Sequence, residues 1–89
     1  MPKFERYILA AKIEEITLEL LKDLFAAGRH PKTHKLEFLS QAAVKVDLLK
    51  TLLRLAEETK SITTKKYLEL SENLQEIGKM LGGWIRSLS

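Results

Sequence analysis

The 89-residue chain contains no cysteine, so it can form neither a disulfide nor a cysteine–zinc site. This composition is compatible with a reducing cytoplasm, where we expect the protein to act. Apolar runs are short, as in Ile8–Ala11, so we expect no membrane-spanning segment. Charges at Lys3, Glu5 and Arg6 leave no apolar core for a signal peptide.

The sequence also lacks the residue sets that enzymes and metal sites need. Its two histidines, His30 and His34, flank Pro31, which argues against a helical metal-binding pair. No serine stands in a nucleophile–base pattern. The glycines between Gly78 and Gly83 lie in a helical pattern rather than in a phosphate-binding loop. We therefore predict no catalytic residue, no cofactor and no metal.

What the chain does contain is helical periodicity along most of its length. The pattern predicts three long helices over Lys3–Ala27, Leu36–Glu58 and Thr64–Leu88, joined by short connections. We expect an all-α antiparallel bundle that forms one domain over residues 1–89. Hydrophobic residues make up 45% of the chain and charged residues 30%, which favours a folded state. A core this small is marginal alone, so we expect an obligate homo-oligomer.

Each predicted helix carries one apolar stripe with spacings of mostly three and four residues. The stripes are Leu9, Ile13, Ile16, Leu20, Leu24 and Ala27; Leu39, Ala42, Val46, Leu49, Leu53 and Ala56; and Tyr67, Leu70, Leu74, Ile77, Leu81, Trp84 and Leu88. The first two helices carry additional apolar residues outside their stripes. These are Ile8, Leu18, Leu21 and Phe25, and then Val44, Leu48, Leu52 and Leu55. Something must cover this surplus surface, which is a further reason to expect assembly.

Glycines interrupt the last helix, where each costs about 1 kcal/mol relative to alanine. Gly78 and Gly82 are four residues apart and share one face. We predict that they allow close approach of another backbone, so that this helix packs on two sides. Trp84 lies on the apolar stripe and is expected to be core rather than a ligand platform. Thr63 is predicted to cap this helix at its N-terminus.

Charged residues are distributed unevenly, with a formal net charge of +3. Glu15, Glu19 and Asp23 form an acidic ridge, which is either a solvated face or a contact for a basic patch on a neighbouring subunit. Arg29–Lys35 is predicted to be a basic loop, either a plain connector or a phosphate contact. The candidate nucleic-acid-binding residues are Arg29, Lys32, Lys35, Lys50, Arg54, Lys65 and Lys66. Simple solvation, or apolar stems lying over the helix surface, also explains these cations.

Two blocks of sequence resemble a known family. LLKTLLRLA (Leu48–Ala56) and EIGKMLGGWI (Glu76–Ile85), with Lys66-Tyr67 between them, look like the C-terminal half of the Avd family, the accessory variability determinants of diversity-generating retroelements. PKFERYILAAKIEE (Pro2–Glu15) resembles, more loosely, the segment that opens the family's second helix. Where Avd-like sequences usually carry an arginine and an aromatic residue, this chain has Lys50 and Thr51, so the resemblance does not imply base stacking there.

The resemblance implies a fold and a function. Avd-like proteins have four helices and form barrel-shaped homopentamers, and the first of those helices has no counterpart here. We therefore expect a ring of three-helix subunits, whether the shorter chain is natural or trimmed. The family associates with a reverse transcriptase and binds nucleic acid during mutagenic retrohoming, without catalysing a reaction itself. By resemblance the partners are a reverse transcriptase and RNA, or its cDNA, in a bacterium, an archaeon or a phage.

A second hypothesis follows from the surplus apolar surface alone. A small helical bundle with an open groove is also typical of a protein–protein adaptor that has no nucleic-acid role. The salt dependence of binding distinguishes the two hypotheses. Binding of RNA through phosphates weakens steeply with salt, whereas binding of a partner helix by apolar burial barely changes.

Overall fold

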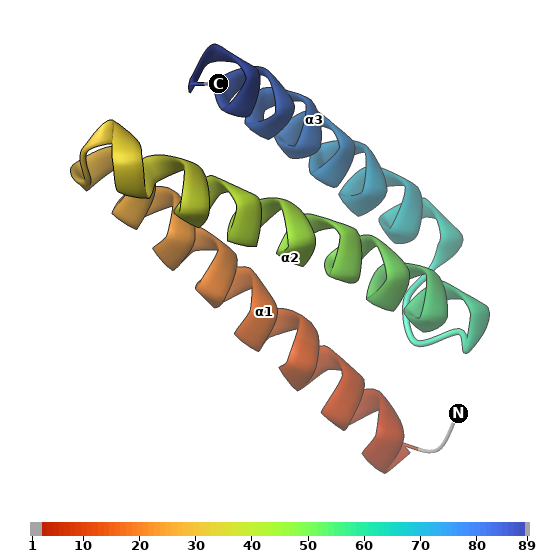
Figure 1. The fold of residues 1–89 in the computed structure, drawn as a ribbon. Coiled ribbons are helices and arrows are strands. Elements are labelled where there is room, and N and C mark those ends of the chain that lie inside the picture. The colour runs from red at the N-terminus through yellow and green to blue at the C-terminus, as the bar shows by residue number, and fades with distance from the viewer. Residues whose placement is uncertain (1–2, 89) are drawn as a thin grey trace.

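The computed structural model describes residues 3–88, and these form three α-helices. They are α1 (Lys3–Arg29), α2 (Lys32–Glu58) and α3 (Thr64–Leu88). No strand occurs within this described range, so the prediction of an all-α protein with three long helices is confirmed. The chain turns back at each of the two connections (Figure 1). None of the described helices is long and apolar enough to cross a membrane.

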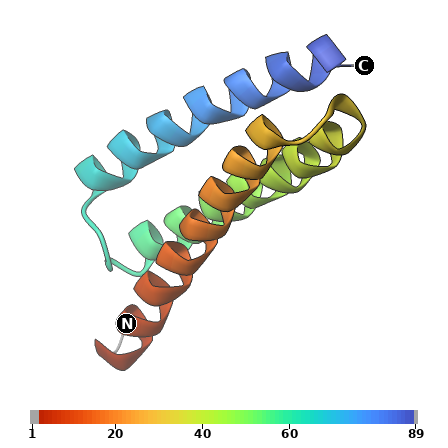
Figure 2. The ribbon, with the colours of Figure 1, turned by 90° about the vertical axis from the view of Figure 1, so that its left-hand side faces the viewer.

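The central helix α2 holds the fold together. Both α1 and α3 pack against it, but no Cα of α1 lies within 8 Å of a Cα of α3 over residues 3–88. Figure 2 shows α1 and α2 running close together, with α3 set apart from α1. The Cα trace measures 45 × 21 × 13 Å, so the protomer is a thin layer rather than a rounded bundle.

The core consists of the predicted stripes. All six stripe residues of α2 are buried, because this helix is covered on two flanks. On α1, Leu9, Ile16, Leu20 and Ala27 are buried; on α3 only Leu74 and Leu81 are, and the rest of those stripes is half-buried. Burial of α3 is incomplete because it has only one neighbouring helix.

The connection between α1 and α2 corrects one prediction. Arg29–Lys35 is not a loop, because α1 continues through Gly28 to Arg29 and α2 begins at Lys32. Pro31 occupies the N-cap position, with φ −65° and ψ 163°, and its carbonyl accepts hydrogen bonds from the backbone N–H groups of His34 and Lys35. Proline suits a helix start, since its missing N–H would have no helical partner there.

The connection between α2 and α3 has caps on both sides. Lys60 adopts a left-handed backbone (φ 59°), the backbone N–H of Ser61 bonds the carbonyl of Ala56, and the N–H of Lys60 bonds that of Glu57. This pair of bonds is the Schellman arrangement. The Thr63 hydroxyl accepts a hydrogen bond from the N–H of Lys66 at 3.1 Å, which confirms the predicted cap of α3.

An ion pair joins α1 to α2. Asp23 is buried, and its carboxylate accepts a hydrogen bond from the ammonium group of Lys45. Both readings of the acidic ridge are therefore wrong for Asp23, whose partner is a lysine of its own chain; Glu15 and Glu19 are exposed. The regular spacing of the three acidic residues does not show that Asp23 lies nearest to the face that α2 covers.

The glycines of α3 have side chains rather than backbones as neighbours. A Cβ built on Gly78 would lie 3.8 Å from Lys50 Nζ and 3.8 Å from Val46 Cγ1, which are ordinary contacts. A Cβ on Gly82 would meet only the guanidinium of Arg86, at 3.5 Å. The protomer therefore has room for alanine at both positions. The predicted approach of a second backbone remains a prediction about the assembly.

We expect Lys45→Met to destabilise the protein by about 3 kcal/mol, because it leaves the buried Asp23 carboxylate without its partner. The double variant Asp23→Leu/Lys45→Met should recover most of this loss, since it removes both charges from the interface. Urea denaturation of the two variants and the parent measures the difference. Equal stability of the single and double variants would show that the pair does not couple the helices.

We expect Gly78→Ala to raise the free energy of unfolding by about 0.5–1 kcal/mol, because alanine loses less backbone entropy in a helix and meets no clash in the protomer. Thermal unfolding and light scattering together test this. A control is Gly28→Ala near the end of α1, where a Cβ would have no atom within 4 Å. A loss of assembly with Gly78→Ala alone would instead indicate that another backbone packs on Gly78.

Candidate nucleic-acid interface

A shallow groove between α2 and α3 gathers cations from both helices. We call it the α2–α3 groove; its lining is Ala43, Val46, Asp47, Lys50, Gln75, Gly78 and Lys79. Lys50 and Lys79 supply two positive charges, and Asp47 one negative charge. Gly78 contributes no side chain to the floor, and the Lys50 ammonium lies 3.8 Å from the place that a Cβ on Gly78 would take. Arg54 follows Lys50 by one helical turn on the exposed side of α2 and extends the positive charge.

This arrangement suits a phosphate backbone better than a base. Lysine and arginine side chains contact phosphate oxygens without reading sequence. The groove lining includes no aromatic side chain on which a base could stack. The site is also open and shallow, as a surface for an extended polyanion needs to be. Electrostatic attraction at such a site is screened by salt.

The other candidate cations lie at the two ends of the molecule. Arg29 ends α1, and Lys32 and Lys35 lie in the first turn of α2, so these three residues share one end. Lys65 and Lys66 lie in the first turn of α3, which is at the opposite end, next to the end of α2 (Figure 1). Because α2 has 27 residues, the two groups are about 40 Å apart. A single protomer therefore does not bring all seven predicted residues together.

Lys35 has an internal partner. Its ammonium lies 5.9 Å from the centre of the Trp84 ring, which is within the range of a cation–π contact. Trp84 itself is half-buried and packs against the core cluster. The contact links the first turn of α2 to the last turns of α3, so Lys35 supports the fold as well as contributing positive charge.

The histidines at the same end are also engaged with neighbours. The ring of His30 stacks on Phe38, with centroids 4.9 Å apart and planes 11° apart, and His34 meets His30 edge-on at 6.1 Å. These rings therefore pack the corner between α1 and α2.

Lys79 is the residue of the groove that sequence reasoning missed. Its place near the C-terminal half of a helix is accounted for by the helix dipole, so the pattern alone gives it no role. The available signal was its spacing from Gly78 and Gln75, which puts all three near one side of α3. Lys45, in contrast, is withdrawn from the surface by Asp23.

Comparison with known proteins places the chain in a family. A search of curated proteins and a search of solved structures found no match to the chain. A family model described as bAvd-like matches residues 1–88. The match extends over both blocks that resemble Avd and over the more loosely similar N-terminal segment, which confirms the resemblance drawn from the sequence. The chain therefore belongs to the bAvd-like family.

Proposed function

We propose that this protein is a non-catalytic accessory protein of a diversity-generating retroelement. In this role it binds the reverse transcriptase and the template RNA, or the cDNA copied from it, during mutagenic retrohoming. Membership of the bAvd-like family supports the role. The observation that supports the nucleic-acid part is that Lys50 and Lys79 line the same groove, together with Gly78, which has no side chain.

A homopentameric ring would strengthen weak phosphate contacts. Each protomer has a formal charge of +3, so five copies carry about +15. In a ring the cations at the two ends of the protomer, which are separated on one chain, recur around the circumference. Repetition of Lys32, Lys65 and Lys66 then gives a polyanion several points of contact on each end, and the α2–α3 groove supplies contacts between them.

Four hydroxyl groups are bonded to nearby backbone carbonyls. Thr17, Thr51 and Thr59 each donate a hydrogen bond to a backbone carbonyl four residues earlier, and Ser87 donates to the carbonyl of Trp84. The hydrogen bonds of these hydroxyls are therefore local to the backbone of their own helix or its end. Within residues 3–88 no group of three His, Cys, Asp or Glu side chains is positioned to hold a metal ion.

An adaptor role is the second candidate, and the apolar surface between α1 and α3 favours it. Two adjoining pockets there are lined mainly by apolar side chains. In the accessory role this surface serves assembly. In the adaptor role it holds a helix of another protein, and RNA has no part.

We expect Lys50→Glu/Arg54→Glu to weaken RNA binding at least tenfold at low salt, because two phosphate contacts become repulsive. Fluorescence anisotropy of a labelled structured RNA, titrated across a range of salt concentrations, measures this. The magnitude of the log–log salt slope should be smaller in the variant than in the parent by roughly 1.4–1.8, because each of the two lost phosphate contacts removes about 0.7–0.9. Light scattering should show the same oligomer for the variant and the parent.

The matched control is Lys3→Glu/Lys12→Glu, which changes the net charge equally on the exposed surface of α1. It should retain most of the affinity. Equal losses in both double variants would mean that only net charge matters. Unchanged affinity in Lys50→Glu/Arg54→Glu would refute the assignment, and absence of RNA binding by the parent at low salt would favour the adaptor.

A further inference from the structure

The protomer exposes more surface than a compact chain of its size. Its accessible area is 6391 Å², whereas a monomeric protein of 10.2 kDa exposes about 5,300 Å². The radius of gyration is 14.5 Å, against about 12 Å for a compact domain of this length. The excess area of about 1,100 Å² is comparable to the roughly 800 Å² that each partner buries in a standard interface. The protomer therefore has the excess accessible surface that is expected of one subunit of an oligomer.

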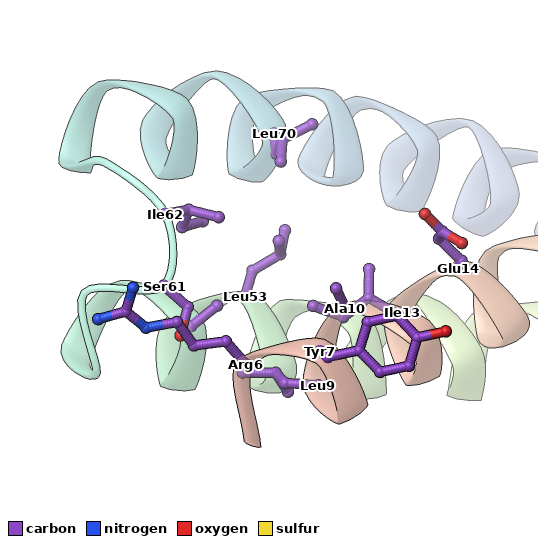
Figure 3. A pocket seen from close by; sticks show the side chains of 11 residues that line it. Arg6, Tyr7, Leu9, Ala10, Ile13, Glu14, Leu53, Ser61, Ile62 and Leu70 are labelled. Carbon is purple, nitrogen blue, oxygen red and sulfur yellow. The ribbon is translucent and has the colours of Figure 1, made fainter. Parts of the chain in front are cut away.

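Part of this excess lies in a groove between α1 and α3, which we call the α1–α3 groove. Ile13, Leu53 and Leu70 line both of its pockets, so the two form one continuous channel. Figure 3 shows Leu53 rising from α2 toward Leu70 of α3, with Ile13 and Ala10 of α1 beside them. The floor is apolar and open, and it follows the helices.

A matching ridge occurs on the outer face of α1. Its residues, with spacings that alternate between three and four, are Phe4, Tyr7, Ala11, Glu14, Leu18, Leu21 and Phe25. This is the spacing of a second helix-packing seam. Each member from Tyr7 onward lies two positions before a member of the face that packs on α2, so the ridge points away from that helix. Phe4 and Tyr7 are each 73% exposed, and Phe25 is 71% exposed.

The charges beside the ridge and the groove are complementary. Lys22 and Arg29, seven residues apart, follow ridge residues Leu18 and Phe25 by one turn and are exposed. On α3, Glu69 and Glu76 flank Asn73, which lines the groove, and are also seven residues apart. Because the two spacings are equal, Lys22 and Arg29 can face Glu69 and Glu76 at the same time. Glu14 lines the groove from α1 and adds negative charge, while Arg6, which also lines the groove, and Lys66, one turn before Glu69, are opposing cations.

We propose that the α1–α3 groove of one subunit receives the outer face of α1 from a second copy of this chain. Lys22 and Arg29 of the incoming helix then face Glu69 and Glu76 of the receiving subunit. The incoming residues Leu18 and Phe25 lie outside the lining of the groove, although ridge residues Tyr7, Glu14 and Leu21 belong to it. Two different sets of residues therefore meet, so the contact is head-to-tail, and repetition closes into a ring when the rotation per subunit allows it. The inference rests on the homo-oligomer in the proposed function and assigns its interface.

A first experiment removes the apolar ridge. Leu18→Glu/Phe25→Glu should convert the oligomer to a monomer in light scattering at micromolar concentration, with helix content retained in circular dichroism because both side chains are exposed in the protomer. Val44→Glu is the matched control: Val44 is 66% exposed on α2, outside the ridge and the groove, and its variant should assemble like the parent. Assembly of the ridge variant at the parent's level would overturn the proposal.

A second experiment exchanges the charges. Glu69→Lys/Glu76→Lys and Lys22→Glu/Arg29→Glu should each weaken self-association at least tenfold, and the variant with all four changes should assemble again. Failure of the combined variant to recover would overturn the pairing of these residues. Both experiments are done without RNA and leave Lys50 and Arg54 unchanged. A monomeric parent would therefore overturn this interface, whereas loss of RNA binding would overturn only the nucleic-acid role.

Discussion

Burial of α2 on two flanks is the constraint from which the rest of the architecture follows. Leu39, Val46 and Leu53 are nearly inaccessible because α1 and α3 both pack on this helix, and each outer helix has only this one neighbour. Hydrophobic stabilisation scales with the apolar area removed from water. Because α1 and α3 are each covered on one side only, the protomer buries less apolar area than three helices could. Further burial, and therefore further stabilisation, is possible at the outer face of α1 and in the α1–α3 groove.

Charge is divided between holding the layer together and facing outward. Lys45 is drawn against Asp23 at the α1–α2 contact, and Lys35 lies against Trp84 where α2 meets the end of α3. Lys50 lies beside Gly78 of α3 and lines the α2–α3 groove. Because the protomer has room for alanine at Gly78, the groove does not require the glycine, and the approach of another backbone remains its predicted role.

The helices and their stripes could be predicted because they are local. Thr63 caps α3 and the stripe from Tyr67 to Leu88 defines its face, so its bounds were predicted as Thr64–Leu88 and observed as such. The start of α2 was predicted four residues late, because Pro31 and polar neighbours resemble a loop in sequence, whereas proline also suits a helix start. The Asp23–Lys45 pair and the position of Lys79 beside Lys50 depend on how two helices face each other. Periodicity within one helix does not contain that information.

The order of the helices in space has a consequence for how the chain acquires its structure. The Cα atoms of α1 and α3 do not come within 8 Å of each other, so the backbone contacts resemble those of a linear repeat array, in which stability is a sum of nearest-neighbour terms. The α1–α2 hairpin and the α2–α3 hairpin share α2, and side chains of α1 and α3 line one groove. Such local topology favours fast folding. Release of α3 alone would remove both grooves, since each is lined by residues of this helix, and would leave the α1–α2 contacts in place.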